Sequence, residues 1–425
     1  MEESKIVVGL DVGTTKIAAI VGCRNENNKI DIIGVGKVKS VGVMRGVVVN
    51  IDKTVESIKQ AIKEAEEIAG VEIDSVNVGI AGQHIKSFQN DGSLMRESFN
   101  EEISINDVEK LIDSMYNVAV EAGYKIIDVI PQEYNVDNET GIKEPVGMFG
   151  RNLKASFHTI TGQISAIKNL HRCVERSGLK VNNLMLEPIA SAEAVLSEEE
   201  KEAGVALVDI GGGTTDIAIF QDGIIRHTSV IPFGGNVITE DIRQGCTILK
   251  EQAEILKIRY GSAIASENKE TEIVTIPGLK GREPKEISLR NLANIIQARM
   301  EEILKFVYLD IKNSGFSKKL IAGIVLTGGG AQMKHIQQLT ELITSMETRI
   351  GYPTEHLALT ENKDITSPMY STGVGLVLKG FEEMEKKETN KEKSKEETKT
   401  DKESNKPKKT DKLKKWFDDL IKDIN

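Results

Sequence analysis

Two segments about two hundred residues apart carry the same order of residues that could bind a polyphosphate. Each has an apolar run that ends in an aspartate, Asp11 or Asp209, followed by glycine, paired threonines and a second apolar run. Because glycine has no Cβ, a turn of this kind brings backbone N–H groups close to a ligand and can cradle phosphate oxygens. The aspartates can hold a hydrated Mg²⁺. We expect two strand–turn–strand units that grip one polyphosphate from both sides.

Each copy alone is also consistent with an ordinary glycine-containing hairpin. A hairpin needs only about two or three turn residues, so the matched order in both copies exceeds what folding requires and favours a ligand. Two other phosphate-binding motifs fit less well. The sequence contains no GxxxxGK[ST], and Gly211 to Gly213 lead into a β-like run rather than the helix of a Rossmann turn.

Two further positions are predicted at the ends of strands. A strand over Ile321 to Leu326 is followed by Thr327 and a triple glycine, with a helix expected from Gln332. A simple connection would need only one glycine, so we favour a surface on which a ligand lies flat. Glu187 and Pro188 follow a short run that ends at Leu186. Proline suits the first turn of a helix, so Glu187 should lie where a strand passes into a helix, a common place for active-site residues.

The composition limits the possible partners and compartments. With 425 residues, 39% hydrophobic, the chain can bury more than one core. A net charge of −10 argues against nucleic acid as the main partner. Three cysteines without CxxC spacing fit a reduced cytoplasm. We expect no signal peptide, because the N-terminus is acidic, and no apolar stretch is long enough to span a bilayer.

Apolar periodicity predicts two α/β halves that position these turns, each with an insertion. Helices are expected over Asp52 to Gly70, after a capping box at Ser104 to Asp107, and over Ile164 to Arg176. Strands are expected over Ser75 to Ala81, Lys125 to Ile130 and Glu272 to Ile276. The predicted boundaries are 1–82 with 159–198 for the first core, 83–158 for its insertion, 199–240 with 311–381 for the second core, 241–310 for its insertion, 382–410 for a disordered charged linker and 411–425 for an amphipathic helix.

The glycine turns, the Thr327 to Gly330 loop and the Glu187 connection resemble the actin, Hsp70 and sugar-kinase ATPase superfamily. The ordered motifs QEYNVD, PVGMFG, HTITG, LEPIASAEAVL, PFGGNVIT and LTGGGAQM narrow this to a resemblance to the FtsA family of bacterial cell-division proteins, over residues 5 to about 380. The resemblance implies an α/β actin-like ATPase fold with two related ribonuclease-H-like domains. It also implies ATP and Mg²⁺ as cofactors.

Carried over by matching positions, the resemblance assigns roles to individual residues. It places on one side of the phosphates Gly13, Thr14, Thr15 and Lys16, and on the other Gly212, Gly213, Thr214 and Thr215. Further nucleotide contacts are implied for Gly234, Gly235, Glu254, Lys257, Gly328, Gly329, Gly330 and Met333. Asp11 and Asp209 would hold Mg²⁺ through water, and Glu187 with Asp209 would form the catalytic set, Glu187 orienting the attacking water. Glu254 and Lys257, three residues apart, are equally typical of a surface ion pair of little energetic value.

The resemblance also implies partners. We expect self-association into filaments, with the 83–158 insertion contributing to filament contacts, and binding of the C-terminal tail of FtsZ by the 241–310 insertion. Other division proteins are expected to bind as well. We expect weak Mg-dependent ATPase activity at most, so that the nucleotide acts mainly as a polymerisation switch. The chain would tether FtsZ filaments to the cytoplasmic face of the membrane at the septum.

Among the last fifteen residues, six apolar side chains are spaced to lie on one face of a predicted helix. Its members follow the i, i+3, i+4, i+7, i+8, i+11 pattern: Leu413, Trp416, Phe417, Leu420, Ile421 and Ile424. Such a helix can lie in a membrane interface or dock on the protein itself. The charged linker before it favours an external target, and we expect a membrane-targeting helix.

Other classes stay open on the sequence alone. A chaperone-type ATPase would need a peptide-binding domain after the nucleotide fold, and a sugar kinase would need a base facing a sugar pocket. A pilus-assembly or rod-shape relative of actin is the second alternative. The C-terminal position of the amphipathic helix and the form of the first insertion argue against it.

Overall fold

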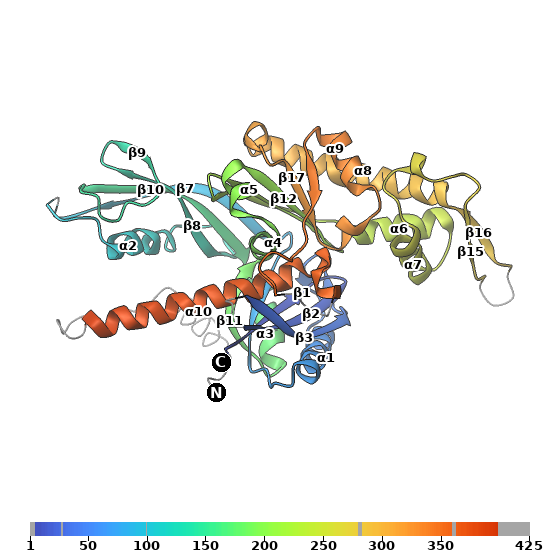
Figure 1. Cartoon of the computed structure of the whole chain (residues 1–425), viewed down its shortest axis with the longest axis horizontal. Coiled ribbons are helices and arrows are strands. Elements are labelled where there is room, and N and C mark those ends of the chain that lie inside the picture. Colours follow the sequence, from blue (N-terminus) through green and yellow to red (C-terminus); the bar gives the residue numbers. More distant parts are fainter. Residues whose placement is uncertain (1–4, 27–28, 99, 279–282, 359–362, 398–425) are drawn as a thin grey trace.

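The computed structural model describes residues 5–26, 29–98, 100–278, 283–358 and 363–397. The predicted membrane-targeting helix, with its six apolar residues, and residues 398–410 of the predicted linker lie outside the described residues. Within the described part, the chain forms two α/β halves and two outlying subdomains along one axis (Figure 1).

The first half is a five-stranded sheet in the order β11-β6-β1-β2-β3. Its strands are β1 (Ile6–Val12), β2 (Lys16–Arg24), β3 (Ile30–Lys39), β6 (Ser75–Ile80) and β11 (Lys180–Leu186). The neighbours β1, β2 and β3 are antiparallel, whereas β6 runs parallel to both β1 and β11. The accompanying elements are β4 (Val43–Met44), β5 (Val47–Val48), α1 (Ile51–Ala69) and α3 (Ile164–Arg176).

The predicted first helix is confirmed as α1. Asn50 caps its N-terminus by accepting a hydrogen bond from the backbone N–H of Lys53, and Gly70 ends it in the left-handed conformation. The apolar positions Val55, Ile58 and Ile62 are buried in the core beneath the sheet. Helix and sheet therefore form because one apolar stripe meets an apolar sheet face.

The second half repeats this topology. Its sheet has the order β14-β13-β12-β17-β18, with two antiparallel neighbours and two parallel ones. The strands are β12 (Val205–Ile210), β13 (Thr215–Gln221), β14 (Ile224–Ile231), β17 (Ile324–Thr327) and β18 (Thr348–Ile350). Helices and the outer hairpin are α6 (Gly235–Cys246), α7 (Lys250–Tyr260), β15 (Ile273–Ile276), β16 (Lys285–Ser288), α8 (Leu289–Asn313) and α9 (Ile336–Thr344). Both repeated sequence segments thus become β hairpins at matching places in their sheets.

Two helices lie between the halves, α4 (Glu187–Val195) and α10 (Ser371–Glu397), with α5 (Glu198–Ala203) after α4. One apolar cluster joins Ile20 of the first sheet, Phe220 of the second and Val377 of α10. A Cβ at Gly375 would lie 1.7 Å from the carbonyl oxygen of Ala190, so only glycine lets α10 approach α4 this closely. The halves are therefore joined through a helix pair.

The end of the described chain differs from the prediction. The sequence predicts that the second core ends at residue 381 and that a disordered linker begins at 382. In the structure, α10 continues as one helix to Glu397. Its buried residues Val374 and Phe381 pack with Val7 of the first sheet. Glutamate and lysine are good helix formers, and Lys386 pairs with Glu382 one turn away. The drop in apolar content after residue 381 therefore does not coincide with the end of the helix.

The first insertion is an antiparallel sheet with one helix, at the left of Figure 1. Its elements are β7 (Ile85–Met95), α2 (Ile105–Met115), β8 (Tyr124–Val136), β9 (Glu139–Ile142) and β10 (Asn152–Gln163). The predicted capping box is confirmed at Ser104 and Asp107. Side chains of β7 contact β14 of the second half: the Gln89 amide donates to the carbonyl oxygen of Arg226 at 2.8 Å. Since Ile85, Ile127 and Ile160 also pack in the core of the first half, the insertion contacts both halves.

Local predictions in the second half need two corrections. Glu272 to Ile276 was expected to form one strand in helical surroundings, but β15 pairs with β16 as a hairpin. The helix expected from Gln332 begins only at Ile336, because His335 takes a left-handed backbone conformation after a single 3-10 turn. Single 3-10 turns are η1 (Ala265–Glu267), η2 (Ser317–Lys319), η3 (Gly329–Gln332), η4 (Lys363–Thr366) and η5 (Pro368–Tyr370).

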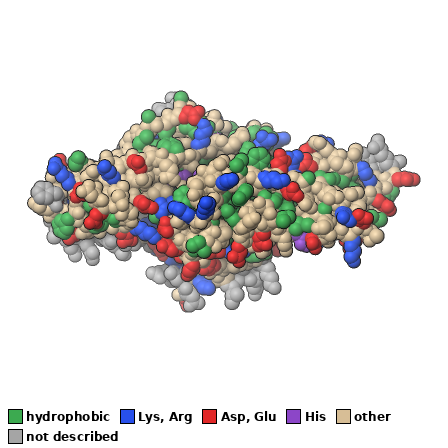
Figure 2. All heavy atoms as spheres, turned by 90° about the horizontal axis from the view of Figure 1, so that it is seen from above, with side chains coloured by type: hydrophobic (Ala, Val, Ile, Leu, Met, Phe, Trp, Pro, Cys, Tyr) green, Lys and Arg blue, Asp and Glu red, His purple; other side chains and the backbone are tan. Residues whose placement is uncertain are grey.

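The surface mixes both signs of charge. Figure 2 shows lysine and arginine side chains interspersed with aspartate and glutamate over the face it presents. No helix in the described part of the chain combines the length and apolar character needed to span a bilayer.

Candidate functional site

The two glycine turns face each other between the halves. A Cβ at Gly212 would lie 1.9 Å from Thr15 Oγ1, and one at Gly213 would lie 2.4 Å from Thr14 Oγ1. Any side chain at these glycines would separate the turns. The geometry therefore brings together the two repeated segments, and it gives a physical reason for glycine at both positions.

The threonines of these turns differ in what their hydroxyls bind. The Thr14 hydroxyl accepts from the Gly46 backbone N–H at 3.1 Å, and Thr15 Oγ1 lies 3.4 Å from Asn236 Oδ1. In the second turn, the Thr214 hydroxyl donates to Asp216 and the Thr215 hydroxyl donates to the carbonyl oxygen of Phe233. The hydroxyls of the second turn are thus used inside their own half.

Four carboxylates surround these turns, together with one lysine. Asp11 is the penultimate residue of β1 and forms an ion pair with Lys16. Asp209 lies directly opposite Asp216 across the β12–β13 pair, and Glu187 begins α4. Asp11, Asp209 and Asp216 are buried. One lysine does not neutralise four acids, so the site carries excess negative charge if all of them are ionised.

The pKa values reflect this crowding. Burial raises the pKa of the Glu187 carboxyl well above its usual range, and the charges of Asp11, Asp216 and Asp209 raise it further. Burial and Asp209 raise the pKa of Asp216 to about 8. Burial alone would lower the pKa of Lys16, but the charge and hydrogen bond of Asp11 and the charges of Glu187 and Asp209 together outweigh it, and the net shift is upward. Like charges in a buried site favour protonated acids unless a cation is bound.

Asp209 is held from the two helices between the halves. Its Oδ2 accepts from the hydroxyls of Ser191 on α4, at 2.8 Å, and Thr372 on α10, at 3.3 Å. Burial raises the pKa of Asp209, while the Ser191 hydrogen bond opposes that shift. Next to Thr372, the Ser371 hydroxyl lies 2.6 Å from that of Thr327. Through Thr372, the beginning of α10 therefore contacts the carboxylate of Asp209 directly.

Glu254 and Lys257 belong to a partly buried network rather than an open surface pair. Lys257 Nζ contacts Glu254 Oε2 at 2.8 Å, the carbonyl oxygen of Gly235 at 3.0 Å and Thr239 Oγ1 at 2.8 Å. The Lys257 side chain is only 11% exposed. Burial lowers its pKa, with Glu254 opposing the shift. These contacts fix α7 against the start of α6.

The remaining predicted residues lie along the second half. Gly234 and Gly235 begin α6, and the Gly235 N–H donates to the carbonyl oxygen of Gly211 at 2.9 Å. Gly328 lies against Asp209, whereas a Cβ at Gly329 would meet open space. Met333 packs at the edge of the second core. The structure thus gathers around the two turns Gly13, Thr14, Thr15, Lys16, Gly212, Gly213, Gly234, Gly235 and Gly328, while Glu254 and Lys257 lie on α7 and Met333 directly follows η3.

The carboxylates fit a hydrated divalent cation. Asp216 Oδ1 is buried without a hydrogen-bond partner among the described residues. Three of the four acids have raised pKa values, which a nearby cation would reverse. Among the described residues, no three acidic, histidine or cysteine side chains are grouped to chelate a metal directly. Mg²⁺ commonly keeps several waters and few protein ligands, which suits Asp11 and Asp209.

We expect the Asp216→Asn variant to gain thermal stability over the parent as pH rises from 5 to 8, in the absence of nucleotide. The folded pKa of about 8 lies above the ordinary 3.8, so the favourable effect of the protonated acid is lost as pH rises towards 8. Asparagine stays neutral and still accepts from Thr214. The melting temperature of the variant minus that of the parent should be roughly 3 to 6 °C larger at pH 8 than at pH 5.

The matched control is Asp222→Asn, a half-exposed acid on the β13–β14 hairpin. Its melting temperature should differ from that of the parent by the same amount at both pH values. A gap for Asp216→Asn that does not change with pH would show that Asp216 is ionised in the folded chain throughout.

The comparisons with known proteins agree with the sequence motifs. The family described as "Cell division protein FtsA" matches residues 206–375, and the "SHS2 domain inserted in FTSA" matches residues 82–161. The cell division protein FtsA of Pseudomonas aeruginosa is 41% identical over 382 residues, which cover 90% of this chain and 91% of that protein. This chain belongs to the FtsA family.

Solved structures confirm the predicted actin-like fold of this FtsA-family chain. The PilM–PilN type IV pilus biogenesis complex matches with a TM-score of 0.65 at 15% identity, over 88% of this chain and 98% of that one. MreB5 of Spiroplasma citri bound to ADP matches with a TM-score of 0.52 at 17% identity, over 90% and 97%. The pilus biogenesis complex and MreB5 thus share the fold, whereas the sequence relatives place the chain among FtsA proteins.

Sequence reasoning missed three residues at this site. Asp216 follows the GGGTT segment within an apolar strand, and an acid inside a buried run is a signal that could have been used. Ser191 and Thr372 carried no such signal, because small hydroxyl residues are common in helices. Their role depends on how the two FtsA-family halves are joined.

Proposed function

We propose that this FtsA-family cell-division protein binds Mg-ATP between its halves, polymerises, and tethers FtsZ filaments to the membrane at the septum. The observation that carries the proposal is the pair of facing glycine turns surrounded by uncompensated carboxylates. Such an arrangement suits a phosphate chain whose negative charge is accompanied by a cation.

Each group at the site has a part in this proposal. Backbone N–H groups of the two turns bind phosphate oxygens, and Lys16 neutralises charge from the first half. Asp11 and Asp209 hold the hydrated Mg²⁺, which supplies charge stabilisation at the phosphates. Glu187, with its raised pKa, orients or deprotonates a water. Glu254 and Lys257 contact the nucleoside portion, with Gly328 to Gly330 beneath it.

Binding matters more than turnover in this proposal. A ligand that contacts both turns favours the arrangement in which Gly212 lies against Thr15, because it binds that arrangement more tightly. A fixed relation between the halves gives every subunit the same shape. Uniform shape is what a filament contact needs, so the nucleotide acts as a polymerisation switch and weak hydrolysis would reset it.

The remaining parts supply partners. The 241–310 insertion, with α7, α8 and the β15–β16 hairpin, is the proposed site for the FtsZ tail. The sequence of residues 411–425 provides an apolar face for a lipid surface. The protein would then be peripheral, on the cytoplasmic side. Other division proteins would reach the same assembly.

We expect vesicles to recruit FtsZ only when this protein, ATP and the FtsZ tail are all present. The measurement is co-sedimentation of FtsZ with vesicles containing anionic lipid, with electron microscopy of filaments in parallel. FtsZ lacking its C-terminal tail is the matched control and should stay in the supernatant. Equal recruitment of both FtsZ forms would remove the tethering proposal, and filaments that form equally without nucleotide would remove the switch.

A further inference from the structure

His84 is a buried histidine that none of the roles above uses. Its side chain is 5% exposed, and neither ring nitrogen has a hydrogen-bond partner among the described residues. An unsatisfied buried polar group costs roughly 1 to 3 kcal/mol, and buried polar groups in native proteins generally have a partner, often an ordered water. The ring therefore needs a partner that the protein atoms around it do not provide.

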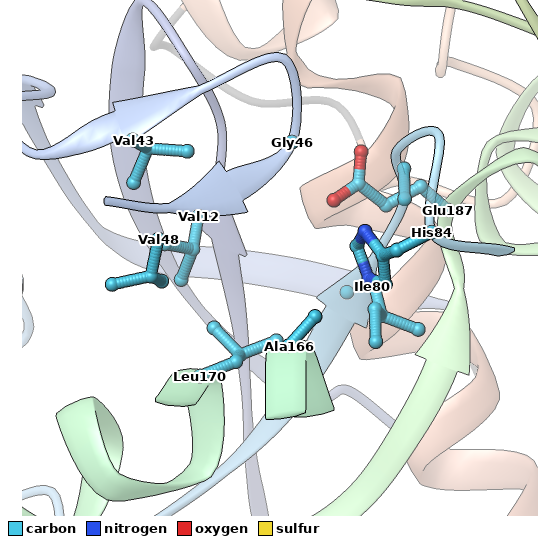
Figure 3. Close-up of a pocket in the computed structure, with 11 residues that line it drawn as sticks. Val12, Val43, Gly46, Val48, Ile80, His84, Ala166, Leu170 and Glu187 are labelled. Carbon is cyan, nitrogen blue, oxygen red and sulfur yellow. The ribbon is translucent and has the colours of Figure 1, made fainter. Parts of the chain in front are cut away.

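The ring borders a small cavity that also reaches Glu187. His84 and Glu187 both line this cavity, and in the view of Figure 3 they lie on one side of it, with Val12, Val43 and Val48 on the other. The space available is about 10 Å³, close to the roughly 10 to 15 Å³ that one water molecule needs. Apolar walls leave the imidazole and the carboxylate as the polar side chains that such a water could contact.

The backbone holds His84 firmly at this place. It lies between β6, which ends at Ile80, and β7, which begins at Ile85, so it marks the entry to the inserted subdomain. Its carbonyl oxygen accepts from the backbone N–H of Gln163, where β10 returns, at 3.0 Å. Both connections of the insertion therefore meet at His84, and the strands on either side together with the Gln163 hydrogen bond hold its backbone in place.

The protonation state suits a bridging role. Burial lowers the pKa of His84 to about 4, so the ring is neutral near pH 7. A neutral imidazole has one nitrogen that donates and one that accepts. The ring can therefore either donate a hydrogen bond to a water or accept one from it, depending on how the carboxyl group of Glu187 orients that water.

We propose that His84 is a positioning residue for Glu187, acting through one water held in this cavity and hydrogen-bonded to both side chains. The bridge fixes the orientation of the carboxyl group at the start of α4. It also links that group to the base of the inserted subdomain. The catalytic consequence rests on the proposed role of Glu187, whereas the bridge itself does not.

The first test is a crystal structure of the full chain at a resolution that resolves waters. We expect a water within hydrogen-bond distance of a His84 ring nitrogen and a Glu187 oxygen. A dry cavity would overturn the proposal, regardless of whether the protein binds ATP. This arm therefore separates failure of the bridge from failure of the proposed function.

The second test compares His84→Leu with His84→Gln. Leucine removes the partner of the water, whereas glutamine keeps a polar group. In His84→Leu we expect a reoriented Glu187 carboxyl group and roughly tenfold slower single-turnover ATP hydrolysis, with ATP affinity little changed. In His84→Gln we expect both to be near the parent. His356→Leu, at an exposed histidine, is the matched control. An unchanged Glu187 orientation in the leucine variant, or equal effects of leucine and glutamine, would overturn the proposal.

Discussion

The Asp209→Ala variant is expected to bind ATP at least tenfold more weakly than the parent in the presence of Mg²⁺. Asp209 combines burial, a raised pKa and a position against Gly328, so its charge is costly without a cation and favourable with one. Removing it takes away one proposed anchor of the hydrated Mg²⁺. Titration of a fluorescent ATP analogue, with Mg²⁺ and with a chelator, measures the effect.

Two further variants separate charge from folding in this experiment. Asp209→Asn keeps an acceptor for Ser191 and Thr372 but removes the charge, so it should lose most of the Mg²⁺-dependent affinity while staying as stable as the parent. Glu139→Gln, at an exposed position of the inserted subdomain, should bind like the parent. An Asp209→Ala affinity equal to that of the parent would show that the metal has been misplaced.

Removal of the last fourteen residues is expected to reduce binding to anionic vesicles to background. The six apolar side chains of the predicted terminal helix would supply up to about 2 kcal/mol each, and ordering about thirteen residues would cost about 1 kcal/mol apiece or more. One helix should therefore bind weakly. Co-sedimentation of the full chain beside a version ending at Asp411 measures the difference, with and without ATP.

The same balance predicts that filaments bind membranes far better than monomers. Several weak anchors on one filament act at a high effective concentration, so ATP should increase vesicle binding through polymerisation. Trp416→Glu, on the predicted apolar face, should behave like the truncation, and Asp418→Asn, outside the predicted apolar face, is its matched control. Equal vesicle binding by the truncated and full chains would remove the tether, and a monomeric variant that binds as tightly as the parent would remove the need for a filament.

Much of the site could be predicted from local patterns. The two turns were recognisable because a repeated order of aspartate, glycine and threonine has few other uses, and Glu187 because proline marks a helix start. Asp216 was missed although an acid inside a buried run marks it, and its importance comes from its pairing with Asp209 across β12–β13. Ser191 and Thr372 were missed because they lie on helices that are distant from each other in sequence. Tertiary contacts of this kind leave no periodic trace.

The secondary-structure elements also divide into those that local patterns predict and those that depend on tertiary partners. Long amphipathic helices such as α1 and α3 were predicted nearly to the residue, because one apolar stripe defines them. The polar strand β16 and the late start of α9 at Ile336 were missed, since their conformation is set by partners rather than by composition. The extent of α10 was missed for the opposite reason: a charged sequence with strong helix propensity looks unstructured when only apolar content is counted.

The helix α10 also sets a distance. Its last apolar residue packed on the body is Met384, and the helix continues to Glu397, which at about 1.5 Å per residue is a further 20 Å or so. Figure 1 shows this part projecting from the first half. The helix is therefore a spacer as well as a packing element. The chain therefore leaves the last described turn of α10 about 20 Å beyond its last apolar contact with the body, so whatever follows Glu397 is attached at a distance from the first sheet.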